Sequence, residues 1–276
     1  MMFQPILRFP GFLTRACTLS YDDGVREDVR LVEIMRKNGV KGTFNLNTVN
    51  LLEGSDRCLS LKESIELYGD DMEIAIHGYN HLQLEVFPIH MAMRDIIANR
   101  EYLENSLGKV VRGMAYAFGT YDQNVIDMLR MADIAYARTT ETTESFDLPT
   151  EWLELHPTCH HKQPNLFELV DKFLADPVPN NFKTRKPRLF YLWGHSYEFP
   201  RDDNWDVIER FCEIMGKSDT VWKATNIEIY NYMKAFHSLN FSADGAYVEN
   251  LSSIDVYMCI DKRNILVKAG ETVSTR

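Results

Sequence analysis

The chain alternates short apolar runs with longer segments of mixed polarity. Continuous or alternating apolar runs predict buried β-strands at residues 15–21, 42–46, 72–76, 110–115, 134–137 and 188–193. Apolar positions spaced three and four apart predict helices at residues 25–38, 88–107, 124–132, 165–175, 203–215 and 226–238. Pro88 and Gly108 are typical boundaries for the second of these helices. This alternation favours a parallel sheet with helical crossovers.

The last part of the chain has a different pattern. Short β-type runs occupy residues 247–248, 254–260 and 265–267, and the polar residues 261–264 between the last two are typical of a hairpin turn. We therefore predict an α/β domain over residues 1–240 and a small β appendage over residues 241–276.

Polar residues follow several of the predicted strands. The first run ends in the sequence SYDDG at residues 20–24, the third precedes HGYNH at residues 77–81, and the last ends at His195. Polar, site-like residues at the ends of several strands are typical of a (β/α) barrel, whose active site lies at the carboxyl ends of its strands. We predict a distorted (β/α) barrel, with an open doubly wound sheet as the alternative.

The residue types at these strand ends suggest a metal-dependent hydrolase. Two histidines and a carboxylate are a common ligand set for catalytic zinc, with one position left open for water. Alone, an Asp-Asp-Gly sequence is most often a turn, and an isolated His-x-x-x-His pair is most often on the surface or at a cap. Their occurrence together, at the ends of separate strands, favours a metal site.

These motifs resemble those of the polysaccharide deacetylase family (carbohydrate esterase family 4). That family's motifs read Thr-Phe-Asp-Asp-Gly, then His-(Ser/Thr)-x-x-His, and later Leu-x-x-His or Leu-x-His. Residues 20–24, 77–81 and 192–195 match them in order, and the resemblance spans residues 15–237. It implies a seven-stranded barrel and one divalent metal ion, with zinc as the first choice and cobalt, manganese or nickel also suited to the ligands. By the same resemblance, Asp22 is the general base, His195 is the general acid, and the metal ligands are Asp23, His77 and His81.

The sequence departs from the family at its third and fourth motifs. The third reads Arg-Pro-Pro-Tyr-Gly in the family, and residues 115–119, which include Tyr116, have alanine at the arginine position. Arg138, at the end of the next apolar run, is the preferred replacement beside Asp22, and Arg112 is the alternative, although either could be a solvated surface arginine. The fourth motif, an Asp followed by Asp-Trp, is only loosely matched by residues 147–152, which end at Trp152. Tyr116 and Trp152 are candidates for contacting the substrate or for supporting the site.

Two further polar residues are candidates for the substrate groove or for supporting the site. His160 belongs to a second His-x-x-x-His pair without an acidic partner at a strand end, and we expect it to line the groove rather than to bind a second metal. Glu198 follows His195 by three residues. Glu198 either orients His195 and stabilises its protonated form, or it is an ordinary solvated glutamate.

Composition narrows the function classes. The 276 residues, 45% of them hydrophobic, suffice for one large α/β domain, and the net charge of −10 argues against nucleic acid or an anionic membrane as partner. Five scattered cysteines without a Cys-x-x-Cys pair suggest reduced thiols. The first ten residues lack the pattern of a signal peptide, and no run approaches the ~18 apolar residues of a membrane span. We therefore expect a cytoplasmic enzyme.

The function predicted from these features is metal-dependent removal of acetyl groups from an N- or O-acetylated saccharide of small or oligomeric size. One alternative is hydrolysis of a non-sugar amide, such as a formamide, cyclic imide or ureide, on the same barrel. The intact ligand set argues against it. The other alternative is a catalytically silent saccharide-binding protein, supported by the missing third-motif arginine. A homo-oligomer is compatible with the sequence, which does not fix the oligomeric state.

Overall fold

A computed structural model describes residues 4–53, 55–175 and 186–276. Its centre is an eight-stranded sheet in which the strands follow the path β6-β5-β4-β3-β2-β8-β7, with β9 beside β2. All pairs in this sheet are parallel. The strands are β2 (Arg15–Asp22), β3 (Gly42–Leu46), β4 (Glu73–Ile76), β5 (Gly113–Ala115), β6 (Tyr136–Arg138), β7 (Cys159–His160), β8 (Arg188–Gly194) and β9 (Val221–Lys223).

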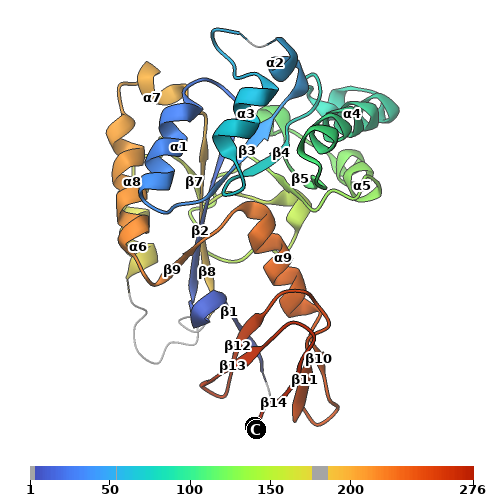
Figure 1. The fold of residues 1–276 in the computed structure, drawn as a ribbon, viewed down its shortest axis with the longest axis vertical. Helices are drawn as coiled ribbons and strands as arrows, with labels where there is room; N and C mark the ends of the chain where they lie inside the picture. The colour runs from blue at the N-terminus through green and yellow to red at the C-terminus, as the bar shows by residue number, and fades with distance from the viewer. Residues whose placement is uncertain (1–3, 54, 176–185) are drawn as a thin grey trace.

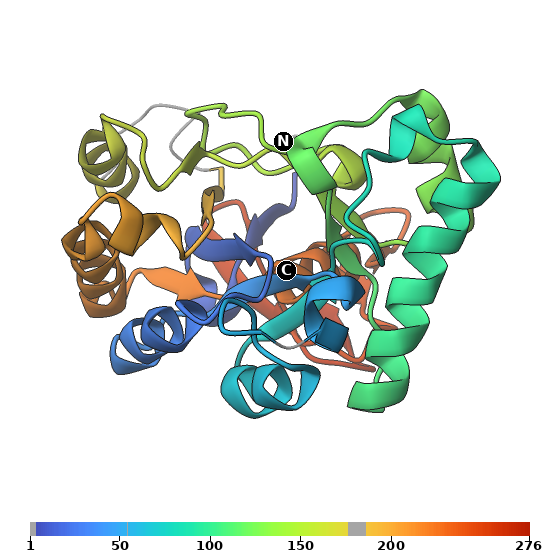
Figure 2. The same ribbon diagram turned by 90° about the horizontal axis from the view of Figure 1, so that it is seen from above.

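Helices cover the outside of the curled sheet, as Figures 1 and 2 show. Their apolar faces point inward; in α1, for example, Leu31, Val32 and Met35 are fully buried. The α-helices are α1 (Asp28–Lys37), α2 (Thr48–Glu53), α3 (Leu61–Tyr68), α4 (Ile89–Leu107), α5 (Gln123–Met131), α6 (Leu166–Leu174), α7 (Glu198–Arg201), α8 (Trp205–Lys217) and α9 (Asn226–His237). Short 3₁₀ turns are η1 (Pro10–Phe12), η2 (Leu84–Val86), η3 (Ala117–Gly119) and η4 (Trp152–Glu154).

One short segment links the two edges of the curled sheet. Leu155 exchanges backbone hydrogen bonds with Ala137 and Thr139, at 3.0 and 3.1 Å, and so pairs with β6. The N–H groups of Thr158 and His161 then donate to carbonyls of β8, both at 2.9 Å. The predicted distorted barrel of seven strands is confirmed, and β9 is an additional strand that pairs with the beginning of β2. The chain does not form the open doubly wound sheet.

The start of α9 fills the end of the barrel where the strands begin. The Asn226 side chain accepts from Thr18 Oγ1 at 2.8 Å and donates to Tyr191 Oη at 2.6 Å. Beside it, the Ile227 N–H donates to Glu73 Oε2 at 2.9 Å, and burial raises the pKa of Glu73 to about 7. These polar groups inside the barrel are thus hydrogen-bonded to the start of α9, whereas the predicted site residues lie at the opposite end, where the strands finish.

The C-terminal strands form two small antiparallel sheets at one end of the molecule, at the bottom of Figure 1. Their orders are β1-β12-β13 and β10-β11-β14, and β1 (Ile6–Arg8) comes from the N-terminal part of the chain. The remaining strands are β10 (Asn240–Phe241), β11 (Tyr247–Glu249), β12 (Val256–Ile260), β13 (Arg263–Val267) and β14 (Thr272–Ser274). The hairpin turn predicted between the last apolar runs is found at Asp261 and Lys262, both in the left-handed region that a type I′ turn requires. The division at residue 240 stays a prediction.

The sequence pattern does not predict the shortest elements. Strands β7 and β9 have two and three residues, too few for a periodic pattern, and the strand predicted at residues 110–115 begins only at Gly113. Helix α3 was also missed, although Ser60 and Glu63 form a capping box at its start. Within the described ranges, no helix combines the length and the apolar character needed to cross a membrane.

Candidate functional site

The residues predicted at strand ends meet at the carboxyl end of the barrel. Asp22 is the last residue of β2 and Asp23 follows it, His77 follows the last residue of β4, and His195 follows the last residue of β8. Asp23 has a φ of 78°, a left-handed conformation that only a well-supported turn holds in a residue other than glycine. In the sheet β8 is next to β2, and β4 is separated from β2 by β3 alone. This arrangement brings residues that are far apart in sequence together.

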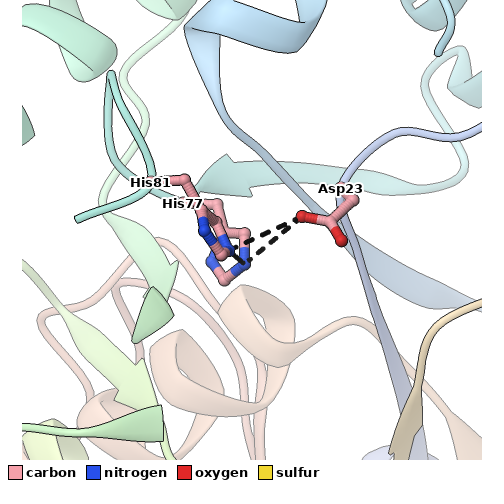
Figure 3. Close-up of side chains that lie close together, drawn as sticks. All are labelled: Asp23, His77 and His81. Atoms are coloured by element: carbon pink, nitrogen blue, oxygen red, sulfur yellow. Dashed lines mark hydrogen bonds and ion pairs between the residues drawn. The ribbon is translucent and has the colours of Figure 1, made fainter. Parts of the chain in front are cut away.

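Asp23, His77 and His81 form a compact group in which the three side chains face one another (Figure 3). Asp23 Oδ1 lies 3.8 Å from His77 Nε2 and 3.7 Å from His81 Nε2, and the two Nε2 atoms are 3.2 Å apart. Tetrahedral ligands at zinc distances of ~2.0–2.1 Å lie about 3.3–3.4 Å from each other. The group is therefore close to the size that a divalent cation requires.

The protonation of the histidines also fits a cation. His77 Nδ1 is 2.9 Å from the carbonyl oxygen of Ala115, which can only accept, so in the neutral ring the hydrogen is on Nδ1 and the lone pair of Nε2 faces the group. Burial and the neighbouring His77 lower the pKa of His81, which favours the neutral imidazole that metals bind. The three residues could thus hold one divalent ion with an open position for water.

Asp22 lies beside this group and is almost fully buried. Its Oδ2 accepts from Arg138 Nη2, and its Oδ1 accepts from Asn45 Nδ2 at 2.8 Å. Burial alone would raise its pKa, but the charges of Arg138, His77 and His195 outweigh burial and lower the pKa to about 2. Asp22 is therefore ionised at neutral pH and oriented through both oxygens.

The two candidate arginines lie in different places. Arg138 is fully buried at the end of β6, and its guanidinium stacks on the ring of Trp193 at 4.4 Å. Arg112 instead lies just before β5 and pairs with Asp133 at 2.5 Å. Of the two, the structure brings only Arg138 to Asp22.

Asp22 is also close to a group of polar side chains around Glu198. His195 Nε2 is 3.8 Å from Asp22 Oδ2, and its Nδ1 is 3.6 Å from Glu198 Oε2. His160 Nε2 lies 3.0 Å from the same Glu198 oxygen. Burial acts to lower the pKa of His195, but Glu198, Asp22 and Asp23 outweigh it and raise the pKa. This histidine is thus held toward its protonated form.

His160, His161 and Glu198 also lie close enough together to resemble metal ligands. The backbone N–H of Lys162 donates to His160 Nδ1 at 3.1 Å, so in the neutral ring the hydrogen is on Nε2, which then donates to Glu198. A metal would need that Nε2 lone pair. Lys162 and Arg201 add positive charge near the same carboxylate, at 3.8 and 3.1 Å. These contacts favour a hydrogen-bonded group over a metal site.

Two other predicted residues do not reach this region. Tyr116 is buried, donates to the carbonyl of Leu153 at 2.8 Å and stacks on Tyr121. Trp152 packs against Tyr230 of α9, with ring centroids 5.0 Å apart. Neither joins the group formed by the acidic residues and the histidines.

Three further residues contribute to the site. Asn45, in β3, donates to Asp22. Trp193, in the run before His195, stacks under Arg138 and also contacts the His160 ring at 4.6 Å. Phe118 has a left-handed backbone, is 60% exposed and lies edge-on to His81 at 4.6 Å. Its place within the third motif was the available signal.

Comparison with known proteins bears on this geometry. Residues 13–137 match the family model described as polysaccharide deacetylase. This match confirms the resemblance to the polysaccharide deacetylase family. No curated protein matches the chain. The segment that matches the family model contains Asp22, Asp23, His77 and His81. It ends before Arg138, Glu198 and His195.

Solved structures give the fold. A Mycobacterium smegmatis protein assigned to the polysaccharide deacetylases is 15% identical, with a TM-score of 0.58 over 86% of this chain and 96% of that one. The 4-alpha-glucanotransferase from Thermococcus litoralis is 11% identical, with a TM-score of 0.55 over 79% of this chain and 40% of that one. A Streptococcus pyogenes deacetylase in complex with acetate is 22% identical, with a TM-score of 0.47, and the match covers 50% of this chain and only 61% of that one. At such identities the first two likenesses show the barrel fold alone, and this fold carries different activities in different proteins.

Proposed function

We propose that this protein is a metal-dependent deacetylase that removes acetyl groups from an N- or O-acetylated saccharide. The observation that supports this most strongly is the arrangement at the barrel mouth. An ionised carboxylate, Asp22, lies close both to the ligand-like group and to a histidine with a raised pKa: its Oδ2 is 4.0 Å from His77 Nε2 and 3.8 Å from His195 Nε2. A base and an acid next to a metal site suit attack of water on a carbonyl followed by protonation of the leaving group.

The roles follow from the contacts. Asp23, His77 and His81 would hold the divalent ion, which when bound supplies a polarising charge and an acidic water. Asp22 takes the water's proton, because it is ionised and Arg138 and Asn45 fix its orientation. His195 then protonates the leaving amine or alcohol, and Glu198 behind it stabilises its charged form. Zinc is the ion we propose first.

Two alternatives remain distinct from this proposal. A hydrolase of a non-sugar amide would use the same residues on another substrate. A silent saccharide-binding protein would lack turnover, and the Arg138–Asp22 pair argues against it because it supplies the positive charge missing from the third motif. Five buried, unpaired cysteines support a reducing, cytoplasmic setting and therefore small or oligomeric substrates.

Acetate release measured over a panel of N- and O-acetylated mono- and oligosaccharides, on protein of known metal content, tests the proposal. We expect metal-dependent acetate release from at least one saccharide. Turnover of formamides, cyclic imides or ureides alone would support the first alternative. Saccharide binding without any release, in metal-loaded protein, would support the second.

The metal site can be tested by removing both histidines. Protein with His77→Ala and His81→Ala should lose its stoichiometric metal, because only Asp23 of the three ligand-like residues remains. Replacing His160 and His161 with Ala is the matched control and should leave the metal content unchanged. Metal analysis with circular dichroism separates loss of the ion from unfolding. Full metal content in the first variant would place the site elsewhere.

The acid side of the site is tested by Glu198→Gln. Removing this carboxylate should lower the pKa of His195, since burial then opposes the charged ring with less compensation. An acid must be protonated to act, so the basic limb of the kcat/KM profile should move to lower pH. Asp202→Asn is the matched control, because Asp202 pairs with Lys162 and Arg201 but not with His195. An equal shift in both variants would contradict the role of Glu198.

A further inference from the structure

Helix α4 packs behind the loop that carries His77 and His81, and two of its buried side chains bind that loop. Both Asp95 oxygens accept from it: Oδ2 from the Tyr79 N–H at 2.9 Å, and Oδ1 from the Asn80 N–H at 3.0 Å and from Asn80 Nδ2 at 2.7 Å. One helical turn later, Asn99 Oδ1 accepts from the His77 N–H at 3.0 Å. The two side chains together accept hydrogen bonds from the backbone N–H groups of three residues of the loop, His77, Tyr79 and Asn80.

The carbonyl groups of the same loop are held from the other side. The N–H groups of Thr48 and Val49, at the start of α2, donate to the carbonyls of Gly78 and Tyr79 at 3.4 and 3.0 Å. Asn99 Nδ2 donates to Thr48 Oγ1 at 2.8 Å and so joins α4 to α2. The loop is therefore fixed between two helices, and Asn99 contacts both the loop and α2.

The loop needs such support because His81 has a φ of 54°, in the left-handed region that residues other than glycine seldom adopt. Gly78 has a φ of 82°, which a glycine adopts without strain. A Cβ on Gly78 would come within 2.8 Å of Asp95 Oδ2. The family motif has serine or threonine at this position, and the glycine in this chain leaves room for the Asp95 carboxylate.

We propose that Asp95 and Asn99 are positioning residues that hold His77 and His81 in their metal-binding arrangement before an ion binds. The proposal rests on the proposed function only in taking these histidines as ligands. Asp95 suits the task because a carboxylate accepts from all three donors, whereas an amide would turn its NH₂ group toward one of the loop's N–H groups. Partners that orient metal ligands are typically worth about 10–100-fold in metal affinity.

The first test is the zinc affinity of Asp95→Asn, measured without substrate by competition with a chromogenic chelator. We expect the dissociation constant to rise by about 10–100-fold. Glu73→Gln is the matched control. Glu73 is a buried carboxylate at the other end of β4 that also accepts a backbone N–H, from Ile227. The Glu73→Gln variant should bind zinc with the affinity of the unchanged protein, even if its melting temperature falls.

Asn99→Ala and Gly78→Ala carry the test further and remain informative if Asp95→Asn does not fold. Asn99→Ala changes no charge and should also weaken zinc binding. In Gly78→Ala the new Cβ would be too close to Asp95 Oδ2, so this variant should also bind zinc more weakly. Unchanged zinc affinity in the folded variants would overturn the proposal, as would a loss in Asp95→Asn alone, which would indicate a charge effect. If the unchanged protein binds no stoichiometric zinc, the proposed ligand set fails first, and the positioning role fails with it.

Discussion

Asp22→Asn should keep its metal yet lose roughly two to four orders of magnitude in turnover, the usual contribution of a general base. The substitution preserves the size of the side chain, so Arg138 and Asn45 still surround it. An amide, however, cannot take a proton from water. Acetate release at saturating substrate, with metal content measured on the same sample, checks the expectation.

Asp23→Asn is the partner experiment, because it makes the same chemical change one residue later. Asp23 Oδ1 faces both histidine nitrogens, so loss of its charge should weaken metal binding first, and excess metal should restore part of the activity. The two variants serve as controls for each other. If Asp22→Asn lost metal and Asp23→Asn kept it, the roles of the two carboxylates would have to be exchanged.

The ligand-like group could be predicted from sequence because its members come from two short continuous motifs. The first motif is at the end of a strand with a clear apolar pattern and the second directly follows another, and parallel strands bring their carboxyl ends to one edge. The same argument predicts that Arg138 lies near the site, since it ends a strand next to β5. Its stacking on Trp193 could not be predicted. Strands β6 and β8 are far apart along the sheet, and the short segment around β7 brings them together.

The residues that hold the histidine loop, Asp95 and Asn99, could not be predicted from the sequence for a different reason. Asp95 and Asn99 lie on the buried face of α4, where a polar residue has no partner that periodicity can name. Their partners lie 15 to 22 residues earlier, in a loop whose left-handed conformation becomes visible only in the structure. Glu198 was noted for its spacing from His195, but its contact with His160 depends on β7, a strand of two residues.

Arg138→Met should shift the acid limb of the pH–rate profile upward and slow the reaction. Burial acts to raise the pKa of Asp22, and Arg138 contributes most to the charges that lower it to about 2. An opposite charge at this range typically lowers a carboxylate pKa by about 1–3 units, so removing it should restore a shift of that size. A base acts only when ionised, and activity would then fall at a higher pH than in the unchanged protein.

Arg112→Met is the matched control, since Arg112 pairs with Asp133 and donates to its carbonyl at 2.9 Å, away from Asp22. It should leave the profile unchanged. Leaving a buried carboxylate unpaired costs about 3–5 kcal/mol of stability at neutral pH, so each profile is measured below the melting temperature of its own variant. Because Asp22 is protonated at low pH, the stability difference between Arg138→Met and the unchanged protein should narrow there. An unshifted acid limb in Arg138→Met, together with a shift in Arg112→Met, would reverse the assignment of the two arginines.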